Sequence, residues 1–151
     1  MNEEFNIVNG VVEDYYGSGD AVIPKGVTAI GARAFLDTDV YTVVIPEGVR
    51  VIGDSAFSAC YGLTKVTLPS TVERIESQAF YNTVITSVTL PRALRFIGWS
   101  AFSGCMDLTD VTYLGTVAEF NRIEKVEPIF SDRNPTTKVR CIDGVVTLRD
   151  L

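Results

Sequence analysis

The sequence predicts a right-handed repeat solenoid of parallel β-strands with a hairpin cap at each end. Three observations predict it. An apolar-Pro dipeptide recurs at an almost constant step, an Ala-Phe dipeptide recurs in register with it, and both ends of the chain leave this pattern. Repetition at a fixed step of about 20–50 residues is typical of chains that stack one structural unit on the next.

Residues in fixed positions mark the repeat. The apolar-Pro dipeptide recurs at steps of 22, 23 and 22 residues, at Ile23-Pro24, Ile45-Pro46, Leu68-Pro69 and Leu90-Pro91. The Ala-Phe dipeptide ends at Phe35, Phe57, Phe80 and Phe102, and an isoleucine lies five residues before each phenylalanine. We therefore expect four repeats over residues 25–114. One coil is too small to bury its own apolar side chains, so the coils should stack with phenylalanine on phenylalanine.

Each repeat changes its pattern along its length. Segments such as residues 63–68 are rich in β-branched side chains and alternate over their last positions, which favours a strand. Proline follows and ends the strand, because it has no N–H to donate. Residues 71–75 predict a second short extended piece, and the Ala-Phe stretch predicts one turn of α-helix or 3₁₀-helix.

The repeat length alternates with the residue at one corner. Copies with Cys60 and Cys105 reach a leucine three residues later, whereas copies with Thr38 and Thr83 reach the next apolar residue after two. We interpret the two cysteines as small buried apolar side chains. A disulfide between them is excluded, because two coils separate them by roughly 10 Å and bridged Cα atoms lie within about 7 Å.

Both ends are expected to cap the solenoid, because an open end exposes apolar core and unpaired strand edges. Residues 1–24 should form a hairpin around Asn9-Gly10 and the first strand. Residues 115–151 should form a helix and a hairpin around Asp143-Gly144. Both dipeptides favour type I′ turns.

The helix of the C-terminal cap is predicted from a capping-box pattern. Thr116 and Glu119 have the spacing at which each side chain bonds the other residue's backbone. The helix should continue to about Lys125. No shift in composition marks a linker, so residues 1–151 are expected to form one domain.

Composition excludes several functions. The 151 residues carry a net charge of −6, and the 13 Lys and Arg form no run or stripe, which argues against nucleic acid. The sequence has no histidine, phosphate-binding loop, nucleophile elbow or metal motif, so we expect no enzyme activity, no metal and no cofactor. No apolar run approaches the roughly 18 residues that a membrane helix needs, so we expect no membrane insertion.

The first residues bear on location. The chain begins Met1-Asn2-Glu3-Glu4-Phe5, without a positive segment followed by an apolar one. As the sequence stands, this favours a cytoplasmic location. Removal of a leader before Met1 would instead favour the cell surface or secretion.

The repeat residues resemble those of the BspA-like leucine-rich repeat family of bacterial and protist proteins. The family unit is similar to apolar-x-x-Val-x-apolar-Pro, then Val-x-x-Ile-Gly-x-x-Ala-Phe and a Cys or Thr corner. Residues 5–23 and 111–123 resemble its leading and closing segments, with Glu76 in place of a glycine and Phe120 in place of a tryptophan. The resemblance implies a leucine-rich-repeat-like solenoid, an interaction role, adhesion in some long exported members, and no catalytic residues.

The outward side chains of the main strands form the first candidate surface. If Val66 and Leu68 point inward, their neighbours point outward. The outward rows are then Val44, Thr67, Thr89 and Thr112, and Thr42, Lys65, Ser87 and Asp110. Solenoids commonly bind partners with such a wide strand face, so this platform is a candidate for a protein or a glycan. The alternative is that threonine simply suits an exposed strand position.

Two aromatic residues form the second candidate surface. Phe96 and Trp99 occupy positions that vary between repeats, and exposed aromatic side chains can anchor a partner. The alternative is that they pack under a cap. Other large side chains at variable positions near the corners are Tyr61, Tyr81 and Met106.

The sequence therefore predicts a non-enzymatic protein-interaction or scaffold module that presents a rigid solenoid surface to a protein partner. An extracellular adhesin or glycan-binding surface module is the alternative, and a signal peptide upstream would favour it. The sequence leaves the ligand and the oligomeric state open.

Overall fold

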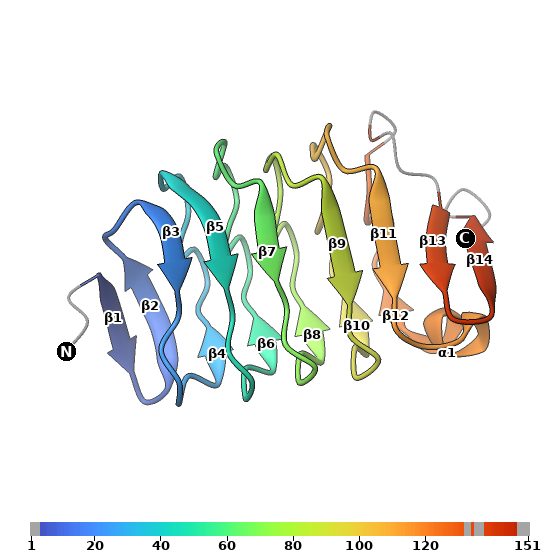
Figure 1. Cartoon of the computed structure of the whole chain (residues 1–151), viewed down its shortest axis with the longest axis horizontal. Coiled ribbons are helices and arrows are strands. Elements are labelled where there is room, and N and C mark those ends of the chain that lie inside the picture. The colour runs from blue at the N-terminus through green and yellow to red at the C-terminus, as the bar shows by residue number, and fades with distance from the viewer. Residues whose placement is uncertain (1–3, 132–133, 135–137, 148–151) are drawn as a thin grey trace.

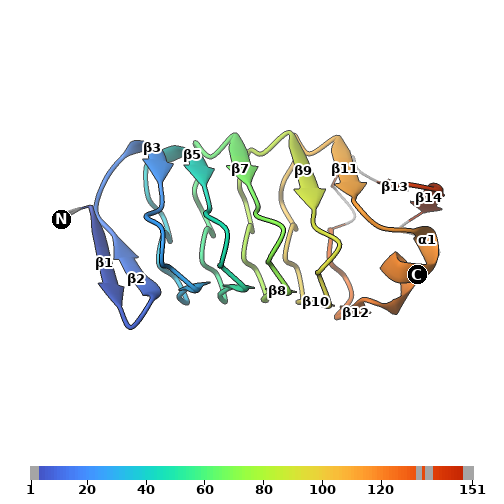
Figure 2. The ribbon, with the colours of Figure 1, turned by 60° about the horizontal axis from the view of Figure 1, so that its bottom comes forward.

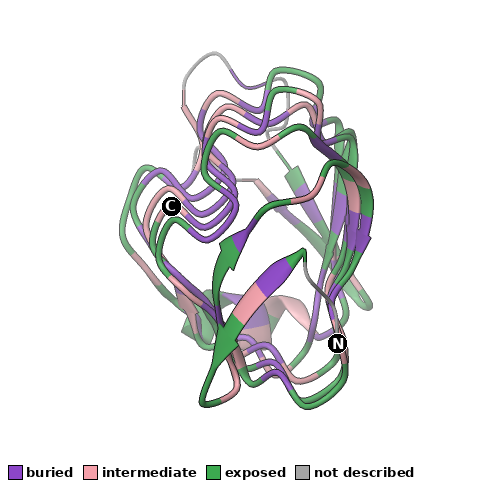
Figure 3. Ribbon diagram, turned by 90° about the vertical axis from the view of Figure 1, so that its left-hand side faces the viewer, coloured by how far each residue is buried: buried purple, intermediate pink, exposed green. Residues whose placement is uncertain are grey.

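The chain winds into coils that lie side by side along one axis (Figures 1 and 2). The computed structural model describes residues 4–131, 134 and 138–147. Viewed along the axis, the coils superpose, with buried residues on their inner side and exposed residues outside (Figure 3). The parallel pairing of strands from successive coils confirms the predicted solenoid.

One long wall of the solenoid is a continuous seven-stranded sheet in the order β1-β2-β4-β6-β8-β10-β12. Its strands are β1 (Phe5–Val8), β2 (Val11–Tyr15), β4 (Ala29–Ile30), β6 (Val51–Ile52), β8 (Arg74–Ile75), β10 (Phe96–Ile97) and β12 (Glu124–Lys125). The hairpin β1–β2 is antiparallel, and every later pair in this sheet is parallel. We call this sheet the continuous wall.

The opposite wall divides into two sheets. The first contains β3 (Gly19–Val22), β5 (Val40–Val44) and β7 (Lys65–Thr67), and the second contains β9 (Ser87–Leu90), β11 (Asp110–Tyr113), β13 (Lys138–Cys141) and β14 (Gly144–Thr147). Strands β7 and β9 follow each other on this divided wall, yet they are not hydrogen-bonded neighbours, and Figure 1 shows the gap between them.

The division coincides with a change in corner length. The corner is measured from the repeat phenylalanine to the first buried valine of the next strand. This spacing is nine residues between Phe57 and Val66 but eight between Phe80 and Val88. Where the longer corner follows a shorter one, the strands pair in regular register, as in β5–β7 and β9–β11. Where the shorter corner follows the longer one, they separate. Each phenylalanine is fixed in the core. A corner that is one residue shorter therefore shifts the start of its strand relative to the strand of the preceding coil.

A column of stacked aromatic rings forms the core. The ring centroids of Phe35 and Phe57 lie 4.6 Å apart, and Phe57–Phe80 and Phe80–Phe102 each lie 5.3 Å apart. All four are fully buried, which confirms the predicted stacking. Tyr15 extends the column at 4.6 Å from Phe35.

Phe130 extends the column beyond the four repeats, at 5.6 Å from Phe102. The backbone of its segment continues the coil pattern, because the Phe102 amide donates to the Ile129 carbonyl just as the Phe80 amide donates to that of Ala101. The sequence analysis did not find this partial coil, since Ile129 replaces the alanine of the repeat.

The Ala-Phe stretches form successive single turns. In the first copy, the Ala34 amide donates to the Gly31 carbonyl and the Leu36 amide to the Arg33 carbonyl. Arg33 has φ 59° and Asp37 φ 57°, and the left-handed conformation recurs at equivalent positions such as Ser55 and Ala59. This conformation ends a right-handed helix after one turn, so the predicted helical turn takes the form of separate turns.

The cysteines lie in the corners as predicted. Cys60 and Cys105 are fully buried and free. The thiol of Cys60 donates to the Phe35 carbonyl at 2.9 Å, and Thr38 of the preceding coil lies 3.5 Å from its sulfur. Cys105 repeats this arrangement with the Phe80 carbonyl and Thr83. Each cysteine therefore fills the corner and satisfies a carbonyl of the coil before it.

The N-terminal hairpin forms as predicted, with positive φ at Asn9 and Gly10. The predicted position of the C-terminal turn is wrong by one residue. Strand β13 ends at Cys141 opposite Gly144, so Ile142 and Asp143 form the loop. The Asp143 carboxylate accepts a hydrogen bond from the Val117 amide at 2.8 Å, which fixes it beside the cap helix.

The cap helix α1 spans Val117–Arg122 and begins with the predicted capping box of Thr116 and Glu119. The prediction that it continues to about Lys125 is wrong. Ile123 is extended, and the Glu124 amide donates to the Arg95 carbonyl of the preceding coil. Pairing with the continuous wall therefore ends the helix and makes residues 124–125 a strand.

Candidate binding surface on the divided wall

Six of the eight predicted binding residues lie together on the outer side of the divided wall. We call the outward side chains of β5, β7, β9 and β11 the outward strand face. Its members among the predicted residues are Val44, Lys65, Thr67, Thr89, Asp110 and Thr112, of which Thr112 is half-buried and the others are exposed. The register places Val44 beside Thr67 and Thr89 beside Thr112, so each predicted row forms within a sheet and is interrupted between β7 and β9.

A cavity of about 380 Å³ lies in the outward strand face, at the gap between β7 and β9. Its lining includes three of the predicted residues, Lys65, Thr67 and Thr89. Leu68 also lines it and is half-buried, whereas the equivalent Ile45 and Leu90 are buried. The sequence analysis found these residues but not the cavity, because the cavity depends on how two neighbouring coils differ.

The gap interrupts a regular series of backbone hydrogen bonds. The Ile23 amide donates to the Val44 carbonyl, and the Ile45 amide donates to the Thr67 carbonyl, each at 3.1 Å. The next bond of the series, from the Leu68 amide to the Thr89 carbonyl, does not form among the residues described. An N–H donor and a carbonyl acceptor therefore face the cavity, where β7 and β9 would otherwise pair.

Lys65 differs from the charged residues Asp20 and Asp110 of the divided wall in having no partner among the described residues. The Asp20 carboxylate accepts a hydrogen bond from Thr42 at 2.8 Å, and Arg140 pairs with Asp110 at 2.8 Å. The Lys65 ammonium is exposed and has no hydrogen bond or ion pair with any residue that the structure describes. Lys65 is thus an unpaired cation at the mouth of the cavity.

A second cavity of about 240 Å³ lies on the same wall between β11 and β13, and its lining includes Lys138 and Val145. The Arg140–Asp110 ion pair spans these two strands. The lining of this cavity therefore already contains one ion pair, between Arg140 and Asp110.

The other two predicted residues lie on the opposite side of the coil. Phe96, in the continuous wall, is half-buried, and the Arg74 guanidinium lies 4.1 Å from its ring centroid. Glu76 holds that guanidinium at 2.7 Å, so the face of Phe96 is covered. Trp99 follows β10 in a turn and is 46% exposed. The structure therefore does not join these residues to the outward strand face.

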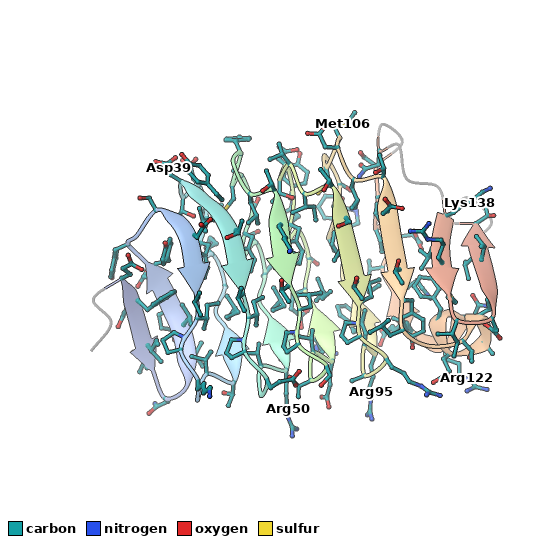
Figure 4. All side chains as sticks on the ribbon, viewed as in Figure 1. Asp39, Arg50, Arg95, Met106, Arg122 and Lys138 are labelled. Carbon is teal, nitrogen blue, oxygen red and sulfur yellow. The ribbon has the colours of Figure 1, made fainter. Side chains whose placement is uncertain are left out.

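The large side chains at the corners form a third group. Tyr61 and Met106 are exposed at 65% and 51%, and Figure 4 shows Met106 at the corner above β9 and β11. Met106 and Tyr81 line a cavity of about 290 Å³ with Asn82 and Ser131. Of these lining residues, Ser131 belongs to the C-terminal cap.

A groove of about 390 Å³ at the cap helix was missed by the sequence analysis. It lies between α1 and the turn after β9, and includes Arg92, Arg95 and Arg122. Glu119 binds Arg92 through two hydrogen bonds of 2.8 and 2.9 Å, and this pairing lowers the pKa of Glu119 to about 2. The groove therefore contains a paired carboxylate that is anionic at neutral pH.

Burial shifts the pKa of several titratable groups in the interior. Burial raises the pKa of the Cys60 and Cys105 thiols, so they are neutral and poor nucleophiles. Burial lowers the pKa of Lys125, whose ammonium donates to the Phe120 and Ile123 carbonyls at the end of α1. The described residues contain no cluster of three or more His, Cys, Asp or Glu able to hold a metal. They also contain no helix long and apolar enough to cross a bilayer.

Comparison with solved structures gives bacterial leucine-rich repeat proteins. The chain is 29% identical to the T. pallidum leucine-rich repeat protein TpLRR, with a TM-score of 0.72 over 85% of this chain and 62% of that one. It is 22% identical to the pneumococcal vaccine antigen PcpA, with a TM-score of 0.70 over 75% of this chain and 29% of that one. A leucine-rich repeat protein from Bacteroides capillosus is 21% identical, with a TM-score of 0.59 over 92% of this chain and 99% of that one. This chain thus spans less than two thirds of the length of TpLRR and PcpA.

No curated protein matches the sequence. Leucine-rich repeat folds are typically binding scaffolds without catalytic activity, and the family suggests an interaction or surface module. The BspA type leucine-rich repeat region matches residues 18–124 in six copies, a range that begins just before β3 and ends at β12. The chain belongs to the BspA-type leucine-rich repeat family.

Proposed function

We propose that this protein is a non-enzymatic interaction module that binds a protein partner with its outward strand face. The cavity between β7 and β9 carries the proposal, because it gives the outward strand face one concave place, lined by Lys65 and by backbone groups that have no partner among the described residues. Rigid solenoids present wide surfaces of this kind to their partners. A cavity of this size matches the lower end of ordinary binding pockets, about 300–1,000 Å³.

A capture experiment tests this proposal. The immobilised protein is incubated with a cell extract, and recovered proteins are compared for the wild type, Thr89→Arg on the outward strand face and Thr28→Arg on an exposed turn before β4. Thr89→Arg should abolish recovery of a specific partner, because it adds a large charged side chain to the proposed binding face. Thr28→Arg adds the same bulk and charge away from that face and should preserve recovery. A partner that binds Thr89→Arg as well as wild type contradicts the proposal. Trp99→Ala tests the other predicted surface in the same assay.

The second candidate is an adhesin or glycan-binding module at the bacterial surface. The hydroxyl groups of Thr67, Ser87 and Thr89 around the cavity favour it, because hydroxyls donate to and accept from sugar hydroxyls. Binding of the wild type to a glycan array, and its loss in Thr89→Arg, would distinguish this candidate from a protein partner.

A further inference from the structure

The cavity between β7 and β9 differs from an ordinary strand edge, because the two coils that flank it stay bonded to each other. The coils remain bonded above it, where the Val84 amide donates to the Leu63 carbonyl at 3.0 Å. The column rings of Phe57 and Phe80 also remain stacked at 5.3 Å. The two coils are therefore held together beside the cavity by this bond and by the stacked rings, an arrangement that suits a single inserted side chain better than a whole additional strand.

The groups around the cavity define the chemistry of that side chain. The Leu68 amide offers a donor that bonds no group in the described part of the chain, and the hydroxyls of Thr67 and Ser87 offer further donors in the lining. Lys65 adds a positive charge, and it is the charged residue in the lining of this cavity. Donors grouped with one unpaired cation suit a carboxylate, which accepts several hydrogen bonds and binds ammonium groups.

We infer that the cavity binds one acidic side chain, an aspartate or glutamate, from an extended segment of the partner protein. Its carboxylate forms an ion pair with Lys65 and accepts a hydrogen bond from the Leu68 amide. The Thr89 carbonyl accepts a hydrogen bond from a backbone N–H of the same segment. This inference rests on the proposed function and adds the identity of the group that is recognised. Because Lys65 is the single cation at the cavity, the site suits one carboxylate better than a polyanion.

The acidic side chain can be tested directly by amide NMR titration of the full chain. The probes are two blocked pentapeptides, Gly-Thr-Glu-Thr-Gly and its matched Gly-Thr-Gln-Thr-Gly control. The glutamate peptide should shift the amide signals of Leu68, Ser87 and Thr89. The glutamine peptide should bind at least about tenfold more weakly, the effect expected for a hydrogen-bonded charge.

Two protein variants complete the test. Lys65→Met should weaken binding of the glutamate peptide by about tenfold or more, and Lys138→Met, which removes an exposed lysine from β13 of the same wall, should leave it unchanged. Equal binding of both peptides, shifts confined to other residues, or full binding by Lys65→Met each overturn the inference.

Glucuronic acid serves as an acidic sugar probe. If it binds the cavity more tightly than the glutamate peptide, the occupant is an acidic glycan and the inference of a protein segment is overturned. Failure of the peptide while Thr89→Arg still abolishes partner capture overturns the inference alone. Capture that survives Thr89→Arg overturns the proposed function as well.

Discussion

Seven strands run without interruption along one wall of the solenoid, whereas the opposite wall divides between β7 and β9. Both walls are built from the same coils, so the repeat itself does not explain the difference. The residues that lead into the continuous wall keep a constant spacing, with seven residues from Leu68 to Ile75 and seven from Leu90 to Ile97. All variation in repeat length occurs in the corner that leads into the divided wall.

The comparison shows that the continuous wall keeps one pairing pattern in every coil, whereas the divided wall changes its pairing where the corner length changes. A one-residue change in a corner leaves the aromatic column stacked, yet it opens a cavity on the divided wall. The surface that is free to vary between coils is therefore also the surface that gains a concave site. Four predictions test this relation.

The largest effect is expected in the column that both walls share. Phe80→Ala should lower the free energy of unfolding by about 3–5 kcal/mol, because it leaves a cavity between two stacked rings. Urea denaturation measures the loss, with Tyr81→Ala as a control, since that neighbouring ring is only half-buried. Equal stability of Phe80→Ala and wild type would contradict the shared column.

A matched pair of leucines compares the paired and divided parts of one wall. Leu90→Ala should cost about 2–5 kcal/mol, because Leu90 is buried in a paired strand. Leu68→Ala, at the equivalent position beside the gap, should cost less than half as much, since Leu68 is half-buried. Denaturant unfolding of both variants gives the ratio. Equal losses would mean that the gap does not weaken local packing.

Lengthening one corner should close the gap. Replacing Val84 and Ile85 by Tyr-Gly-Leu, the sequence that follows Cys60, gives this corner the length of its neighbour. Strand β9 should then pair with β7, and hydrogen exchange of the Leu68 amide should slow by about tenfold. The Ile45 amide, which is already bonded, serves as the internal control. Unchanged Leu68 exchange in a folded variant would refute corner length as the cause.

The smallest effect is expected at the left-handed positions of the corners. Ala59 has φ 59°, a conformation that glycine adopts without the clash of a Cβ atom. Ala59→Gly should therefore raise the unfolding free energy by about 0.5–1 kcal/mol. Ala56→Gly, in the same turn but fully buried, should lower it. Thermal unfolding of both variants checks the opposite signs.

The sequence predicted the coils because their landmarks are local. Ile75 and Phe80 keep one spacing in every copy, so periodicity alone places them in one column. The alternation between Cys and Thr corners was also visible. The gap that this alternation produces could not be predicted, because it depends on hydrogen bonds between two coils whose lengths differ.

The ends were harder to predict, since partners distant in sequence decide them. The Asp143-Gly144 signal favoured one turn, but the Asp143 carboxylate instead bonds the Val117 amide. The helix pattern continued past Arg122, but the Arg95 carbonyl bonds the Glu124 amide and begins a strand. In the second predicted surface, the ring of Phe96 is covered by Arg74, and no sequence pattern indicated this contact.

At the last coil, the Asn134 side chain takes the place of the backbone groups that a further coil would supply. In earlier coils the backbone amide at this corner donates to a carbonyl of the next coil, as Asn82 does to Ser103. At the last corner, the Asn134 side chain accepts from the Gly104 amide and donates to the Phe102 and Cys105 carbonyls. Because these bonds of Asn134 to the repeats all reach the last coil, inserting coils in the middle of the array would leave them unchanged. A duplicated block of two coils, 45 residues as from Cys60 to Cys105, would preserve the alternation of corners and leave both caps intact.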